Sequence, residues 1–245
     1  MVTGTENLLG EFIGTTVLLV FGCGVCANLT LEKSKGQASG WVNIAIGWGF
    51  AVTLGVFTAT TLGAPQGDLN PAVTFAKMLV GIYTFPQFLM TSLVQILGGI
   101  LGATIVWLAY LPHWAETKDP AAKLGVFCTA PAIRNIPCAF LTELIATFFL
   151  MFVIWMIFSK PVGNMVPGYG PYIVGVLIWA LGLSLGGPTG YAMNPARDLG
   201  PRIAHAILPI AGKGGSDWGY ALVPIVAPLC GVGLAYVVAT ALGAF

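Results

Sequence analysis

Apolar residues are gathered in long runs along this chain, and short stretches rich in glycine, proline and polar residues separate them. A transmembrane helix needs about 20 mainly apolar residues. Six runs have about this length, and the fifth is the shortest: residues 8–29, 41–62, 85–110, 138–159, 169–187 and 219–243. The pattern therefore predicts an all-α membrane protein with six transmembrane helices.

Two shorter apolar stretches, residues 71–80 and 195–208, each follow an Asn-Pro-Ala sequence. Asn is a favoured N-cap and Pro is favoured at the first helical position, so each motif reads as a helix start. Ten helical residues reach about 15 Å, which is half of a hydrocarbon core about 30 Å thick. The glycine-rich loops before them survive at membrane depth only where they line water or are buried in protein. We therefore expect two re-entrant half-helices, beginning at Asn70-Pro71-Ala72 and Asn194-Pro195-Ala196.

The two halves of the chain resemble each other. "GEFIGTTVLLVFG" surrounds Glu11 and "TELIATFFLMFVI" surrounds Glu143, and each half continues with a second span and an Asn-Pro-Ala. Three spans per half is an odd number, so the second half enters the membrane in the opposite sense, which is an inverted repeat. We predict a single transmembrane channel domain over residues 1–245, with repeat halves of about 1–112 and 130–245, and both half-helix starts meeting at mid-membrane.

Composition supports a lipid environment. Charged residues make up only 8% of the chain, whereas a soluble domain has about 25%. The net charge of +1 gives no support for a nucleic-acid partner. Charge is concentrated between Leu111 and Pro137, a segment that we interpret as a solvated connection between the halves; it holds Glu116, Lys118, Asp119, Lys123 and Arg134.

Cysteine and histidine give no sign of a metal or cofactor. Cys23 and Cys26 form a C-x-x-C, but no second ligand pair follows, so both are interpreted as small buried hydrophobes. His113 and His205 also lack ligand-like partners and are interpreted as ordinary interfacial residues. No nucleophile–base pair is evident, and we expect that the protein is not an enzyme.

Two facing helix starts define the expected chemistry. Each N-terminus carries about half a positive charge, so the point where they meet repels cations. Asn side chains offer N–H donors there, and extended loop backbone offers carbonyl acceptors. Such a conduit suits neutral hydroxyl-bearing molecules and refuses protons and metal ions. Glu11 and Glu143 allow two readings, a proton relay or acceptors for loop N–H groups that support each half-helix, and we favour the second.

Both Asn-Pro-Ala motifs, the Arg197 that follows the second one, and Glu11 and Glu143 resemble the aquaporin superfamily of major intrinsic proteins, over about residues 6–243. "MNPARDLGP" is similar to the glycerol-facilitator branch. The resemblance implies two half-helices within six spans, a homotetramer with one pore per subunit, and cytoplasmic termini in the cell membrane. Counting Lys and Arg in loops would instead place the termini outside, because the termini's side holds only Lys77 and Lys160 while the other holds Lys33, Lys35, Lys118, Lys123, Arg134 and Lys213. We follow the resemblance on this point.

An arginine inside an apolar segment is costly and usually functional. Arg197 therefore either lines the pore or forms an ion pair with Asp198, and we favour the pore. The resemblance implies that Trp48, Gly182 and Tyr191 complete a selectivity filter with it. Gly182 matches a position where water-selective members commonly carry His, so the constriction is expected to be wider. Trp48 and Tyr191 would face the C–H edge of a solute, and Arg197 its hydroxyl edge.

Three departures from the glycerol branch are visible. Tyr191 stands where glycerol facilitators usually have Phe. The loop before the first Asn-Pro-Ala is about two residues longer than usual, with Asp68 in the place of a His; Asp68 also reads as a capping acid at a helix start.

We predict a passive channel for glycerol, water and other small uncharged solutes. The first alternative is a channel mainly for dihydroxyacetone, protonated lactic acid or similar neutral hydroxy compounds. The second alternative is an inverted-repeat secondary transporter.

Overall fold

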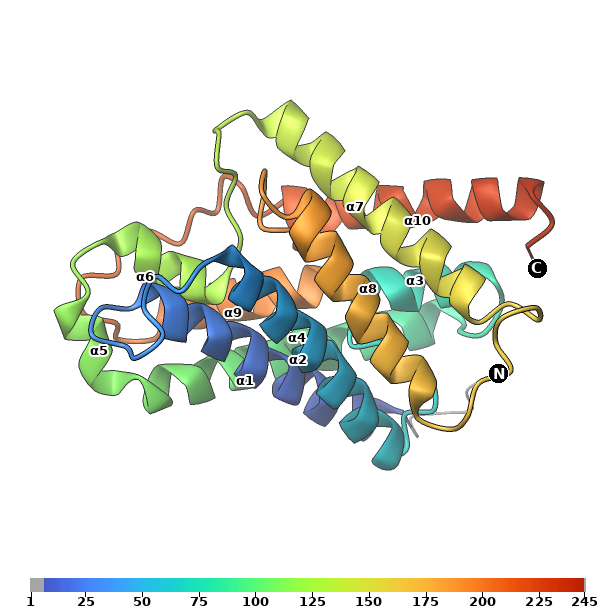
Figure 1. Ribbon diagram of the computed structural model, residues 1–245, viewed down its shortest axis with the longest axis horizontal. Coiled ribbons are helices and arrows are strands. Elements are labelled where there is room, and N and C mark those ends of the chain that lie inside the picture. Colours follow the sequence, from blue (N-terminus) through green and yellow to red (C-terminus); the bar gives the residue numbers. More distant parts are fainter. Residues whose placement is uncertain (1–6, 245) are drawn as a thin grey trace.

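The computed structural model describes residues 7–244; residues 1–6 and 245, which include both termini and the first residue of the expected family match, lie outside the described part. Over the described residues the chain forms ten helices and no strand (Figure 1). Six of the helices are long and follow the six predicted runs within a few residues: α1 (Leu8–Thr30), α2 (Trp41–Thr61), α4 (Phe85–Ala109), α7 (Ile136–Ile157), α8 (Tyr169–Leu185) and α10 (Val223–Ala241).

Helix α8 is the shortest of these six. The other five are long and apolar enough to cross a membrane, whereas α8 has 17 residues and is apolar throughout. Glycine sets both of its ends: Gly168 precedes it in the left-handed conformation, with φ of 86°, and Gly186 follows it. The shortest of the six predicted runs is therefore a helix, but one of only 17 residues.

Two half-helices lie between the long ones, α3 (Pro71–Leu79) and α9 (Pro195–Ile207). Figure 1 shows them one after the other along the long axis of the molecule. Asn70 Oδ1 accepts from Ala72 N–H at 2.9 Å. Asn194 Oδ1 accepts from Ala196 N–H at 2.9 Å and from Arg197 N–H at 3.1 Å. Proline occupies the first turn of each, so both helices begin where local capping chemistry predicted.

The long helices pack around this central pair. Helix α1 packs on α2 and α4, α2 on α8, and α7 on α10, while α4 and α10 cover the half-helices. Glycine permits a close crossing between α4 and α9: a Cβ added at Gly99 would lie 2.8 Å from the carbonyl oxygen of Ala196. This close approach fixes the start of α9 in the interior.

The connection between the halves is only partly solvated, so the prediction of a solvated segment is wrong for its centre. It folds into two short helices, α5 (Leu111–Glu116) and α6 (Pro120–Phe127), which Figure 1 places at the end of the molecule opposite the end of α10. Trp114 and Phe127 are buried. Lys123 is also buried because its ammonium donates to the carbonyl oxygens of Ala211 and Gly212. A charged side chain is tolerated there because backbone acceptors replace water.

Candidate functional site

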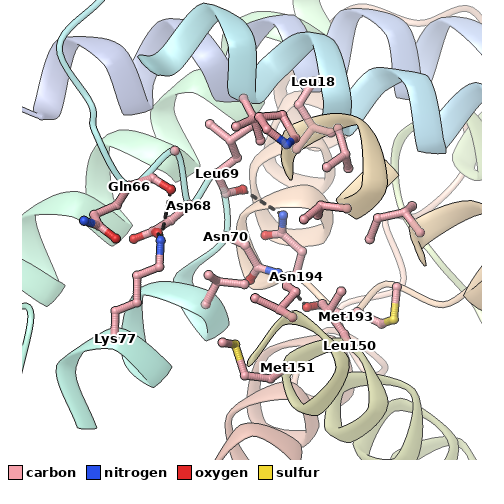
Figure 2. Close-up of a pocket in the computed structure, with 18 of the residues that line it drawn as sticks. Leu18, Gln66, Asp68, Leu69, Asn70, Lys77, Leu150, Met151, Met193 and Asn194 are labelled. Atoms are coloured by element: carbon pink, nitrogen blue, oxygen red, sulfur yellow. Dashed lines mark hydrogen bonds and ion pairs between the residues drawn. The ribbon is translucent and has the colours of Figure 1, made fainter. Parts of the chain in front are cut away.

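The two Asn-Pro-Ala motifs meet in the interior. Asn70 Nδ2 donates to the carbonyl oxygen of Met193 at 2.9 Å, and Asn194 Nδ2 donates to that of Leu69 at 2.8 Å (Figure 2). Each amide therefore caps its own helix and binds the loop before the other one. An amide NH₂ has two N–H donors, so each Asn keeps one that these contacts do not use.

The loops before the half-helices hold a conformation that is unusual for residues other than glycine. Leu69 and Met193 have φ of 53° and 49°, and Tyr191 has φ of 38°. Such conformations cost about 1–3 kcal/mol each and persist only where the surroundings impose them. These conformations turn the loop carbonyl groups away from the direction that they would have in a helix. Other groups can then donate hydrogen bonds to them.

Two buried glutamates impose this conformation. Glu11 accepts from the backbone N–H groups of Asp68 and Leu69, at 2.7 and 2.8 Å. Glu143 accepts from Ala192 and Met193, both at 2.9 Å, and from the Thr189 hydroxyl at 2.7 Å. Both carboxylates are fully buried. The hydrogen bonds match the support reading of these residues, and their equivalent positions match the internal repeat.

A cavity of about 570 Å³ passes this point. Most of its polar lining comes from the half-helices and their loops, namely Gln66, Asp68, Asn70, Lys77, Asn194 and Arg197. Helices α2, α7 and α8 supply mainly apolar side chains, among them Val52, Val56, Leu150, Ile154, Val174 and Ile178. The cavity therefore has a polar edge and an apolar wall, which fits a small solute with hydroxyl groups on a hydrocarbon frame.

Arg197 and Trp48 stand together at one end of this cavity. The guanidinium carbon lies 4.0 Å from the centre of the Trp48 ring, and Nη1 lies 3.5 Å from the carbonyl oxygen of Phe127. Both side chains are buried, and Tyr191 joins them in the lining. Within the part of the chain that is described, the Tyr191 hydroxyl has no hydrogen-bond partner.

Asp198 does not pair with Arg197, so that alternative is wrong. Its carboxylate pairs with Arg202 at 2.8 Å and accepts from the Thr129 N–H and hydroxyl. Arg202 also donates to the carbonyl oxygens of Thr129, Ser216 and Asp217. The pair therefore ties two loops to α9, a role that the sequence analysis missed although the Asp198 and Arg202 spacing of four residues is readable on a helix.

Gly182 does not line the cavity. A Cβ at this position would lie 2.7 Å from both Cζ and the hydroxyl oxygen of Tyr191. Trp41 holds the same region, since its Nε1 donates to the carbonyl oxygen of Gly182 and its ring meets that of Tyr191 edge-on at 5.9 Å. The missing side chain gives room to the Tyr191 ring, and only indirectly to a solute.

Asp68 and Lys77 form a buried ion pair at the other end of the cavity, which sequence analysis did not foresee (Figure 2). The second carboxylate oxygen of Asp68 accepts from the Thr74 hydroxyl at 3.0 Å, and Lys77 also donates to the carbonyl oxygen of Gln66 at 2.9 Å. Asp68 therefore does not cap α3, which Asn70 does. The signal was available in part, because Lys77 stands on the predicted half-helix seven residues after Asn70.

The histidines and cysteines lie apart from this cavity. His205 is fully buried, so its interpretation as an interfacial residue is wrong: Nδ1 lies 2.8 Å from the Ser216 hydroxyl and the ring packs on Phe127. His113 is partly exposed, with Nδ1 2.9 Å from the carbonyl oxygen of Glu32. Cys23 and Cys26 are buried free thiols.

Comparison with known proteins matches nearly the whole chain to one family. A family model described as major intrinsic protein matches residues 2–239. The chain is 52% identical over 225 residues to "Glycerol uptake facilitator protein 3" of Lactiplantibacillus plantarum, with 92% of each chain covered. It is 41% identical over 234 residues to the "D/L-lactic acid transporter" of the same organism, with 94% of each chain covered.

A solved structure agrees with these sequence relatives. The aquaglyceroporin from Plasmodium falciparum matches this fold with a TM-score of 0.84 and 28% sequence identity, covering 96% of this chain and 95% of that one. This likeness confirms the predicted aquaporin-like fold of six spans and two half-helices.

Proposed function

Because the chain belongs to the major intrinsic protein family, we propose that it is a passive transmembrane channel for glycerol, water and other small uncharged solutes. The observation that carries this proposal is the cavity with a polar edge at Asn70, Asn194 and Arg197 and an apolar wall from α2, α7 and α8. The relative named a glycerol uptake facilitator, at 52% identity, supports glycerol as the main solute.

The geometry accounts for passage without coupling or chemistry. A polyol turns its hydroxyl groups toward the free N–H groups of the two Asn amides and toward Arg197, and its C–H edge toward the apolar wall. The two half-helix starts add positive potential at the same point, which raises the energy of a cation there. No bond of the solute is made or broken, so the protein acts as a channel and not as an enzyme.

The filter is assigned to Arg197 and Trp48 with Tyr191, and Gly182 acts through the room that it gives Tyr191. The Arg197 guanidinium has five N–H donors, and these bind hydroxyl oxygens of the solute. The Trp48 ring, stacked 4.0 Å from that group, faces carbon. Glu11 and Glu143 support the two half-helices by holding their loops.

The family resemblance supports a proposal for assembly and orientation. The chain is a multi-pass membrane protein, and we assign it to the cell membrane as a homotetramer with one pore in each subunit and cytoplasmic termini. Many apolar side chains on the long helices are exposed, for example Phe50, Leu93, Phe149 and Val237, and these would face lipid or neighbouring subunits.

A second candidate solute class is a neutral hydroxy acid such as protonated lactic acid. One observation favours it: a relative at 41% identity is named a lactic acid transporter. The Asn70, Asn194 and Arg197 donors that suit a polyol also suit the oxygens of a neutral carboxylic acid group.

Stopped-flow light scattering on proteoliposomes tests both candidates. Glycerol entry is expected to be faster than in protein-free liposomes and unaffected by ionophores that collapse ion gradients. Entry at the rate of protein-free liposomes would remove the glycerol proposal. Uptake of lactate that rises at acidic pH and exceeds glycerol uptake would make the hydroxy acid the main solute.

A further inference from the structure

We propose that Lys77 forms a second polar subsite for the solute, at the end of the cavity away from Arg197, where its ammonium binds a hydroxyl group of a polyol. This inference rests on the proposed function, because it adds a residue to the same pathway.

Lys77 is placed and oriented by three contacts. It stands in the last turn of α3, and its ammonium pairs with Asp68 and donates to the carbonyl oxygen of Gln66 (Figure 2). The Asp68 carboxylate is fully buried and is held in turn by the Thr74 hydroxyl. An ammonium has three N–H donors, and these contacts use two. One donor therefore stays available on a side chain that is only 16% exposed and lines the cavity.

The cavity that Lys77 lines also has aromatic walls. Arg197 stands beside Trp48. Trp155 and Phe158 also line the cavity, and Trp155 packs in the same apolar cluster as Leu79 of α3. The cavity therefore offers charged hydrogen-bond donors and aromatic carbon, which match the two edges of a polyol.

The spacing of donors suits stepwise passage. The Lys77 ammonium reaches back along α3 to Asp68 and to the Gln66 carbonyl oxygen, in the loop just before Asn70. Arg197 follows Asn194 by three residues, within the first turn of α9. The polar edge of the cavity thus presents donors at Lys77, at the Asn pair and at Arg197 in sequence. A solute with several hydroxyl groups can engage the next donor before it leaves the last one.

The pair also explains why a lysine is tolerated here. Asp68 stands where glycerol facilitators usually carry His, and it neutralises the charge of Lys77. Without Asp68, the Lys77 ammonium would repel only cations, which the half-helix starts already repel. Paired with Asp68, it remains a fixed hydrogen-bond donor. The subsite therefore acts on solutes with hydroxyl groups and has little effect on water, which needs no second contact.

The test compares D68N/K77M with D68N and with K77R in proteoliposomes. The double variant removes the ammonium without leaving a buried unpaired carboxylate. The amide oxygen at position 68 still accepts from Thr74, and D68N alone shows what the new amide N–H donors contribute. We expect the half-saturation concentration of the double variant for glycerol flux to rise about fivefold, the loss of one hydrogen bond, with water permeability unchanged. K77R keeps charge and donors and is expected to stay near the wild type. Lys160→Met, an exposed lysine just after α7, is the matched control and should change nothing.

Saturation-transfer NMR with glycerol on the detergent-solubilised protein gives a readout that does not need transport. A weaker transfer signal in D68N/K77M than in the wild type supports the subsite, and an equal signal overturns it. In the flux assay, glycerol and water permeabilities that fall together would show that the pair only shapes the loop, and an unchanged half-saturation would also overturn the proposal. A wild-type protein without glycerol flux would defeat the proposed function, and the NMR comparison would still decide whether Lys77 binds a polyol.

Discussion

The Arg197 guanidinium carbon lies 4.0 Å from the centre of the Trp48 ring. Arg197 comes from the first turn of α9 and Trp48 from the middle of α2, so helices from different halves of the chain meet here. No ion pair holds the guanidinium among the described residues; its contacts are the Trp48 ring and the carbonyl oxygen of Phe127. With so few partners, the Arg197 guanidinium can act on a solute that passes through the cavity.

Replacing Arg197 by Val is expected to admit more protons or small cations while neutral flux is kept. The fixed positive charge raises the energy of a cation in the cavity, and its loss leaves only the half-helix starts to do so. A pH-sensitive dye inside proteoliposomes measures the proton leak. Arg134→Val, at an exposed loop arginine, is the control. Proton leak equal to that of the wild type would argue against a charge barrier at Arg197.

Glu143→Leu is expected to lower stability strongly. The change leaves the N–H groups of Ala192 and Met193 and the Thr189 hydroxyl without their acceptor, and each unsatisfied buried group costs about 1–3 kcal/mol. Thermal unfolding in detergent, followed by circular dichroism, measures the effect. Glu116→Leu breaks an exposed pair with Lys33 and should shift the midpoint little. Equal shifts for the two variants would contradict the support role.

Gly99→Ala is expected to destabilise the crossing of α4 and α9. The new Cβ would lie 2.8 Å from the carbonyl oxygen of Ala196, and overpacking of this kind costs about 1–3 kcal/mol. Gly24→Ala is a matched control on α1, because no atom lies within 4 Å of a Cβ there. It should be neutral or slightly stabilising, since Ala favours a helix interior over Gly. Thermal midpoints of the two variants give the comparison, and a similar result for both would show that α4 can move aside.

Asp198→Ala is expected to cost about 3–5 kcal/mol, the range for breaking a buried ion pair. Both side chains of the Asp198–Arg202 pair are fully buried, so the arginine would be left without its counter-charge. Denaturant unfolding measures the loss, and hydrogen exchange at residues 127–130 and 215–218 reports whether the tied loops open. Asp217→Asn removes the charge from the more exposed pair with Arg134, keeps a residue that tolerates the φ of 48° found there, and should cost far less. Comparable losses in the free energy of unfolding for the two variants would mean that burial does not set the contribution of the Asp198–Arg202 pair to stability.

Tyr191→Phe is expected to leave the ratio of lactic acid uptake to glycerol uptake unchanged. The substitution removes only the hydroxyl, which is buried beside Gly182 and out of reach of a solute, and leaves the ring in place. Uptake of labelled lactate at acidic pH, set against labelled glycerol in the same vesicles, measures the ratio. Trp41→Phe, which removes a ring contact of Tyr191 but no hydroxyl, separates polarity from packing. A lowered ratio would place the hydroxyl inside the pathway.

Much of the architecture was readable from the sequence, because the forces that decide it are local or depend on length. Apolar runs of membrane length became α1, α2, α4, α7, α8 and α10. The Asn-Pro pairs became helix starts at Asn70 and Asn194, since a side-chain cap and a fixed proline φ act within three residues. The sequence therefore determined the spans, the half-helices and the pairing of Glu11 and Glu143 with the two repeats.

Only the tertiary structure decided which groups those elements bring together. The exchange between the Asn amides and the opposite loops joins residues more than 120 positions apart. The partner of Asp198 is Arg202 and not its neighbour Arg197, because side chains four apart lie on one helix face and adjacent ones do not. Lys123 and His205 are buried because backbone and side-chain acceptors from other segments reach them. Such contacts depend on how helices pack, which a linear pattern of apolar and polar residues does not encode.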